Sequence, residues 1–339
     1  MTTNNTPSLL RALPDDVQLR LLAGCRYEDL FSLAAACRAY RDVVNSPRFT
    51  RARRSHGFVE REVVLLGTRR HNAVDIRSAQ TRAVKLSITG ELELNVGGTT
   101  TDGRRVFVTC KNSRHSWKKT CVYALDAMSR QWTRFAYLHP DRALHCMEWY
   151  AGRLYVAGGF TGNNGRTLSS FCVYNEATGS WDHLPPMPVA VCCASSGVIG
   201  DLLLIAGGSS ENTLQIFSFT TRQWRVGPTL LRSRISRPGV VSEGKLFIPD
   251  QNRMLIYDPQ SDAWTEEGLP FSGSWHCACV HYGRIIVFQH NGSAYERDPD
   301  GSWSAYRCAH AHARDALKAP AGAAHGSWGT TRVESVLLG

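Results

Sequence analysis

A tryptophan that recurs at a nearly constant interval constrains the fold of this chain more than any other feature. The recurring residues are Trp132, Trp181, Trp224, Trp264 and Trp303, at intervals of 49, 43, 40 and 39 residues. Each follows an apolar segment and a polar turn, as in YNEATGSW and YDPQSDAW. Two further apolar segments precede that segment. The pattern predicts a repeated unit of four strands.

Repeated four-stranded sheets predict a β-propeller. One such sheet cannot bury both of its faces, whereas radial stacking around an axis covers the faces and leaves only short edges. The glycine pairs Gly158-Gly159 and Gly207-Gly208 end what we expect to be the inner strand of two units, where backbones crowd. We interpret these glycines and the tryptophans as scaffold.

The two ends of the repeat region are expected to meet in one sheet. The first unit, EVVLLGT, AVDIRS and TRAVKL, lacks the tryptophan and a first strand. The chain ends in the strand-like TTRVESVLLG. Residues near 331 to 338 are therefore predicted to supply the missing strand and close the ring. The result is a six-bladed propeller over residues 60–339, with five or seven blades as alternatives because the first unit is divergent.

The units resemble kelch repeats, in which a strand ending in Gly-Gly is followed by an aromatic residue and a tryptophan. LYVAGG and LLLIAGG match this pattern well, whereas Pro249-Asp250 and Gln289-His290 stand where the glycines would be. WD40 propellers need Trp-Asp dipeptides in several blades, and only Trp181-Asp182 occurs. The resemblance implies an all-β kelch propeller.

A small helical module is predicted in front of the propeller, within residues 8–56. Pro14 and the acidic pair Asp15-Asp16 suit the first turn of a helix. EDLFSLAAACRAYRDVV then places apolar residues at helical spacing. Ser46-Pro47 are expected to cap a third short helix. Three short helices form a small core that is marginal without a partner.

The helical segment resembles an F-box, followed by a tail, SPRFTRARRSHG, like that of plant F-box/kelch proteins. Tyr40 stands where the family commonly has tryptophan. The residues that carry the resemblance are Leu13-Pro14-Asp15-Asp16, Leu21-Leu22, Leu30, Leu33, Cys37-Arg38, Tyr40 and Val44.

The two resemblances together imply the substrate-recognition adaptor of an SCF-type ubiquitin ligase, a non-catalytic subunit. The F-box would dock on a Skp-type adaptor and through it a cullin, while the propeller holds a protein target. Tethering raises the effective concentration of the target's lysines near the ubiquitin-loaded enzyme. Leu30 and Leu33 could equally fill the helical core. The expected docking residues are Leu13, Pro14, Leu21, Leu22, Leu30 and Leu33.

Basic and aromatic residues gather in the loops that follow the Gly-Gly strand and the tryptophan strand, which lie on one face of a propeller. With a net charge of +10, this face is expected to bind an acidic or phosphorylated segment through bidentate arginines. A solvated basic surface is the alternative. The residues are Arg69, Arg70, Arg114, Trp117, Lys118, Lys119, Arg166, Arg232, Arg234, Arg237, Trp275 and Arg314.

Other classes of function find little support in the sequence. HCACVH would place Cys277, Cys279 and His281 on one face of a strand, but zinc wants four ligands and no second cluster is evident. We therefore expect no metal and no cofactor. A kelch-propeller enzyme and a non-ligase scaffold stay open as alternatives, although no catalytic motif stands out. Nucleic-acid binding is disfavoured because no basic groove with stacking aromatics is evident.

The compartment is expected to be the cytoplasm, the nucleus or both. No apolar run reaches the roughly 20 residues that a membrane helix needs, and the first residues lack the pattern of a secretory signal. The eleven cysteines have no framework spacing. We interpret them as reduced thiols that fill small core positions.

Overall fold

The computed structural model describes the chain in two compact units. The first comprises Met1–Arg61, Ala127–Ser129 and Leu337–Gly339, and the second Glu62–Asp126 and Arg130–Val336. In strands at 60–66, 71–74, 92–93, 110–112, 275–277 and 332–338 only the backbone is described. The described residues are 14–23, 25, 42–43, 46, 48–49, 52, 60–66, 71–74, 92–93, 98–112, 120–126, 131–161, 165–209, 212–231, 238–250, 252–269, 275–281, 283–289, 293–306 and 332–338.

The first unit contains helix α1 (Asp15–Ala23), which begins where the sequence predicts. The carbonyl of Pro14 accepts hydrogen bonds from the amides of Val17 and Gln18 at 3.0 and 2.9 Å, and the two aspartates occupy the first turn. The predicted cap at Ser46 is also confirmed, since its hydroxyl accepts a hydrogen bond from the amide of Phe49 at 3.2 Å. Most of the second predicted helix lies outside the described residues.

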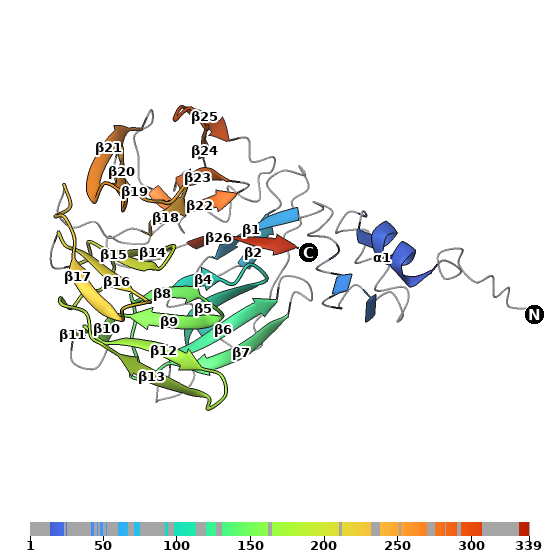
Figure 1. The fold of residues 1–339 in the computed structure, drawn as a ribbon, viewed down its shortest axis with the longest axis horizontal. Helices are drawn as coiled ribbons and strands as arrows, with labels where there is room; N and C mark the ends of the chain where they lie inside the picture. Colours follow the sequence, from blue (N-terminus) through green and yellow to red (C-terminus); the bar gives the residue numbers. More distant parts are fainter. Residues whose placement is uncertain are drawn as a thin grey trace, which may run out of the picture. The chain divides into compact units, whose positions relative to one another are not determined.

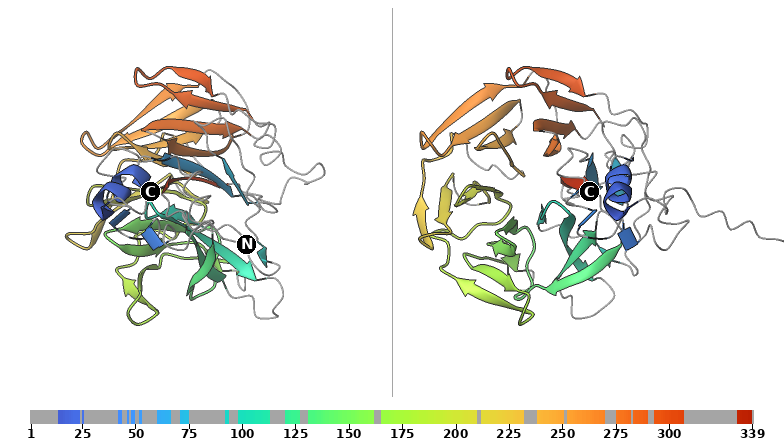
Figure 2. Two further views of the ribbon diagram at one scale, coloured as in Figure 1. Left: turned by 90° about the vertical axis from the view of Figure 1, so that its right-hand side faces the viewer. Right: turned by 45° about the vertical axis from the view of Figure 1, so that its right-hand side comes forward.

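In the described residues of the second unit there are five blades, each an antiparallel sheet of four or five strands. In Figures 1 and 2 these sheets lie like sectors around an axis. Their strands, blade by blade, are β3 (Leu92–Glu93), β4 (Thr99–Thr101), β5 (Arg105–Asn112), β6 (Thr120–Asp126) and β7 (Trp132–Tyr137); β8 (Cys146–Tyr150), β9 (Arg153–Ala157), β12 (Phe171–Asn175) and β13 (Ser180–Leu184); β14 (Ser195–Ile199), β15 (Leu202–Ala206), β16 (Leu214–Ser218) and β17 (Gln223–Val226); β18 (Val240–Ser242), β19 (Lys245–Asp250), β20 (Arg253–Asp258) and β21 (Ala263–Gly268); β22 (Trp275–His281), β23 (Arg284–Gln289), β24 (Ala294–Arg297) and β25 (Trp303–Tyr306).

Every repeated tryptophan lies in the outermost strand of its blade, which confirms the four-strand unit. In three blades the tryptophan pairs directly with the aromatic residue of the neighbouring strand, as Phe217 does with Trp224, and the two rings lie 5.1 Å apart. The indole N–H of Trp224 donates a hydrogen bond to the carbonyl of Pro185, which follows the outermost strand of the preceding blade, at 2.8 Å. These tryptophans therefore link neighbouring blades as well as packing within their own.

The strand that ends in Gly-Gly is not the innermost one, contrary to the expectation from the sequence. In the sheet β13-β12-β9-β8, the Gly-Gly strand is β9 and β8 lies at the edge beyond it. The strands that contact their counterparts in the next blades are β4, β8, β14, β18 and β22. These first strands therefore surround the axis, and the Gly-Gly strands are second from it. Antiparallel order still brings the loops after the second and fourth strands to one end.

The C-terminal strand joins the sheet that the first predicted repeat forms, as predicted. β26 (Arg332–Leu338) pairs with β1 (Glu60–Leu66), which pairs with β2 (His71–Val74), in the order β2-β1-β26. The predicted third strand of this unit, TRAVKL, lies outside the described residues.

The core of the second unit lies between adjacent blades. One apolar cluster joins Phe107 and Val122 of one blade to Leu154 and Cys172 of the next. Similar clusters join each of the following blades to its neighbour. Loop residues also belong to these clusters, as Met187 and Val191 do between β13 and β14. Among the described residues, no helix has the length and apolar character that a membrane crossing requires.

Candidate functional site

The docking residues predicted in the N-terminal segment differ in exposure. Pro14 is exposed and Leu21 is 50% exposed on helix α1, whereas Leu22 is only 1% exposed. Leu21 is therefore available to a partner, and Leu22 packs inside the first unit. Leu13, Leu30 and Leu33 lie outside the described residues.

Of the predicted substrate-binding side chains, the structure describes that of Arg166 alone. Arg166 lies in the short strand β11 (Arg166–Thr167), which pairs with β10 (Phe160–Thr161), and its side chain is exposed. Trp275 begins β22, where only the backbone is described. The convergence of the basic side chains therefore stays a prediction. The remaining positions, Arg69, Arg70, Arg114, Trp117, Lys118, Lys119, Arg232, Arg234, Arg237 and Arg314, lie outside the described residues.

We call the end of the propeller that carries these loops the loop face; its described part comprises residues 138–145, 158–161, 165–170, 185–194, 207–209, 212–213, 227–231, 238–239, 252, 269 and 293. Close backbone approaches hold this face together. Gly158 has a φ of +64°, and a Cβ there would lie 2.4 Å from the carbonyl oxygen of Val191. The amide of Gly159 donates to that same oxygen at 2.8 Å. Only glycine can adopt this φ at position 158 and also leave room for the Val191 oxygen. The Gly-Gly pair therefore allows the two loops to pack closely.

Two buried polar side chains hydrogen-bond to the backbone of the loop face, and neither role has a local signal in the sequence. Gln215 is fully buried; its amide oxygen accepts from the amide of Val189 at 2.8 Å and its amide nitrogen donates to the Val189 carbonyl at 3.1 Å. Arg142 is 2% exposed and donates to the carbonyl of Gly158 at 3.0 Å. Burial lowers the pKa of Arg142, and the nearby Cys172 partly offsets that effect.

The cysteines of this region divide into two chemical classes. The described cysteines form no disulfide bonds, and most of them are buried. Burial raises the pKa of Cys172 to about 11. By contrast, a hydrogen bond from Cys193 lowers the pKa of Cys192 to about 6 against the opposing effect of burial, and Ser209 and Thr167 add smaller lowering contributions. Adjacent cysteines were the only signal of this difference in the sequence.

A cavity of about 330 Å³ lies among the innermost strands of the five blades. Glu148 is the only charged side chain among its described lining residues, and the hydroxyl of Ser196 donates to the Glu148 carboxylate at 2.6 Å. Thr99, Thr100 and Thr101 add further polar groups to the wall. The cavity can therefore hold water or a small polar molecule.

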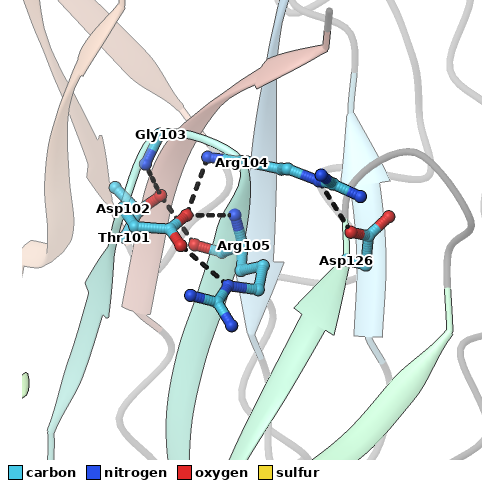
Figure 3. Close-up of polar contacts among 6 residues, drawn as sticks. All are labelled: Thr101, Asp102, Gly103, Arg104, Arg105 and Asp126. Carbon is cyan, nitrogen blue, oxygen red and sulfur yellow. Dashed lines mark hydrogen bonds and ion pairs between the residues drawn. The ribbon is translucent and has the colours of Figure 1, made fainter. Parts of the chain in front are cut away.

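A polar cluster lies in the β4–β5 hairpin, at the end of the blades opposite the loop face (Figure 3), and its Thr101 also lines the cavity. The carboxylate of Asp102 accepts from the backbone amides of Arg104 and Arg105 and from Nε of Arg105, the last at 2.7 Å. Nε of Arg104 meets the carboxylate of Asp126 at 3.0 Å. The guanidinium of Arg105 also lies 5.4 Å from the ring centroid of Trp149, a cavity-lining residue. We interpret the cluster as structural.

No metal site emerges from the part of the chain that is described. Within that part, no group of three or more His, Cys, Asp or Glu side chains is placed to hold a metal ion. The HCACVH segment forms β22, in which Cys279 and His281 are buried. The side chain of Cys277 is outside the described set.

Comparison with known families bears on the propeller. Residues 141–188 match the model of the Kelch motif. This segment spans the blade formed by β8, β9, β12 and β13. The same comparison found no F-box domain in the chain. The kelch propeller is thus shown, and the nature of the helical module is not.

Several curated proteins resemble the chain at low identity. Kelch-like protein 36 of Bos taurus is 28% identical over 242 residues, covering 66% of this chain and 36% of its own length. One F-box/kelch-repeat protein of Arabidopsis thaliana is 29% identical over 140 residues, covering 38% of this chain and 37% of its own length. A second is 27% identical over 288 residues, covering 78% of this chain and 74% of its own length. The chain thus spans little more than a third of the first two relatives.

Proposed function

We propose that this kelch-repeat protein is a substrate-recognition adaptor of an SCF-type ubiquitin ligase and has no catalytic role of its own. Residues 8–56 would form an F-box that docks on a Skp-type adaptor, and through it a cullin. Residues 60–339 would form a six-bladed propeller, with β26, β1 and β2 in the sixth blade, that binds a protein target. Such an adaptor would act in the cytoplasm or nucleus.

The observation that carries this proposal is a half-exposed leucine on helix α1 of a kelch-repeat protein. Leu21 is 50% exposed and Pro14, at the start of the same helix, is exposed as well. Apolar anchors of this kind usually dominate the energy of protein–protein contacts. Two of the similar proteins are named F-box/kelch-repeat proteins. Leu22, being buried, would support the helix rather than touch the partner.

Co-purification of the full chain with a Skp-type adaptor tests this role. We expect the wild type to retain the adaptor and Leu21→Asp to lose it. Arg20→Asp is the matched control, because it places the same carboxylate on the neighbouring exposed position. Circular dichroism checks that all three proteins are folded. Failure of the wild type to bind would refute the ligase role and leave the scaffold and enzyme alternatives; equal binding by Leu21→Asp would refute docking through α1.

The target-binding surface would be the loop face, with an acidic or phosphorylated segment as its ligand. An exposed Arg166 supports this choice, since guanidinium groups pair with carboxylates and phosphates in a bidentate manner. An array of phosphorylated peptides with unphosphorylated counterparts serves as the probe. We expect Arg166→Glu to weaken binding and Arg153→Glu, an exposed position at the opposite end of β9, to leave it unchanged. Equal effects of the two changes would argue against the loop face.

A further inference from the structure

Two adjacent cysteines occupy the loop that leads into β14, on the loop face. Cys192 is 6% exposed and Cys193 is partly exposed. The backbone around them is fixed on both sides, because the amide of Cys193 donates to the carbonyl of Leu144 at 2.8 Å and the amide of Ser209 donates to the carbonyl of Cys192 at 3.0 Å. Cys193 has a φ of +59°, in the left-handed region that residues with a side chain rarely adopt.

The surroundings of the Cys192 sulfur differ from those of the Cys172 sulfur. Its Sγ lies 3.1 Å from the exposed hydroxyl of Ser209, and Cys193 and Thr167 also hydrogen-bond to it. By contrast, the thiol of Cys172 donates to the backbone carbonyl of Val156. A carbonyl can only accept, so that arrangement holds Cys172 as a thiol. Hydroxyl and thiol groups can instead donate to a thiolate.

We propose that Cys192 and Cys193 form a redox-active thiol pair that responds to peroxides. The Cys192 thiolate attacks the peroxide, the O–O bond breaks, and one oxygen leaves as water after taking up a proton. Cys192 is then a sulfenic acid. The Cys193 thiol attacks its sulfur, the S–O bond breaks and a second water leaves. Two cysteine sulfurs have lost one electron each, and a disulfide joins neighbouring residues.

Such a disulfide would be strained and readily reduced. Neighbouring Cα atoms across a trans peptide lie about 3.8 Å apart, whereas disulfide-linked Cα atoms usually lie about 4.4–6.8 Å apart. Closure therefore has to reorient the peptide between the two cysteines. That peptide supplies the bonds to Leu144 and Ser209, and Leu144 precedes β8 of the preceding blade. Oxidation would thus loosen a link between two blades on the loop face, and thiol reductants would restore it.

Mild treatment of the folded full chain with hydrogen peroxide, followed by peptide mass mapping, tests the proposal. We expect the peptide that holds both cysteines to lose two hydrogen atoms and to regain them with dithiothreitol. Cys172 is the internal control and should stay unmodified. Equal oxidation of Cys192 and Cys172, or pairing of Cys192 with a cysteine other than Cys193, would overturn the proposal.

Two substitutions at Cys193 separate its roles. Cys193→Ser keeps a hydrogen-bond donor but cannot form the disulfide, so the sulfenic acid should persist on Cys192 and be trapped by dimedone. Cys193→Ala removes the donor, so Cys192 should react several-fold more slowly with peroxide. Both changes keep a side chain at the same backbone angle, so their effects on folding are comparable. Identical behaviour of the two variants and the wild type would refute the role of Cys193.

Discussion

The buried amide of Gln215 offers a demanding test of how the loop face is held. Gln215 makes two hydrogen bonds to the backbone of Val189, at 2.8 and 3.1 Å, from a strand of the blade that the loop enters. Replacement by methionine keeps the length of the side chain and removes both bonds. Each bond contributes about 1 kcal/mol net, and a buried backbone group left without a partner costs about 1–3 kcal/mol. Because Val189 is only half-buried, we expect a loss of about 2–4 kcal/mol.

Chemical denaturation of the wild type and Gln215→Met measures this loss as a change in the free energy of unfolding. Gln223→Met is the matched control, since Gln223 is exposed on the outermost strand β17 and its replacement should change stability by less than about 0.5 kcal/mol. A Gln215→Met protein as stable as this control would show that water replaces the amide, and the reasoning would be wrong.

Gln215→Glu adds a test that depends on pH. The ionised carboxylate would still accept from the Val189 amide but would face the Val189 carbonyl with a second acceptor. A protonated carboxyl group can donate to that carbonyl instead, so the pKa of this side chain should rise in the folded state. The variant's deficit should therefore be largest at neutral pH, shrink as the pH falls through the raised folded-state pKa, and level off at about 4.3, the ordinary pKa of glutamate. A deficit independent of pH would contradict the two-bond geometry.

Three further predictions concern the scaffold. Gly158→Ala should lower the free energy of unfolding by more than about 3 kcal/mol, because its Cβ would lie 2.4 Å from a backbone oxygen. Gly152→Ala has a similar positive φ but open space around it, so it should lower that free energy by about 1–2 kcal/mol. Denaturation curves of the two variants therefore separate crowding from backbone strain. Trp224→Phe removes the indole hydrogen bond to Pro185 and should lower the free energy of unfolding in urea by about 1–2 kcal/mol. A Trp224→Phe protein as stable as the wild type would show that this bond is dispensable. The pKa of Cys172 rises from 9.0 to about 11 on folding, so the unfolded state loses this proton first as the pH rises. The free energy of unfolding should therefore fall between about pH 9 and 11, by roughly 2–3 kcal/mol at most. Cys172→Ala should reduce this fall.

Sequence periodicity predicted the architecture because the signals of a blade are local. A strand, a polar turn and a tryptophan lie within about ten residues of one another, and turn chemistry together with side-chain alternation depends on near neighbours. Trp181, Trp224 and Trp264 accordingly stand in the outermost strands, one to each blade. The pairing of the C-terminal strand with the first predicted repeat could also be predicted, because unpaired strands at the two ends of a ring can pair with each other.

Tertiary structure alone decided what depends on distant partners. Strand order along the chain does not say which strand faces the axis, and contacts between blades put β8 and not β9 there. Leu21 and Leu22 are the same residue type, and only packing exposes one and buries the other.

The same holds for the chemistry of the loop face. Cys192 and Cys172 are both buried thiols, yet their pKa values move in opposite directions because one sulfur meets hydrogen-bond donors and the other an apolar surround with a carbonyl. Cys193 is the adjacent residue, but the other two donors, Ser209 and Thr167, come from loops far apart in the sequence. Local sequence thus determined the blades, whereas hydrogen bonds across the fold determined which side chains are available, buried or reactive.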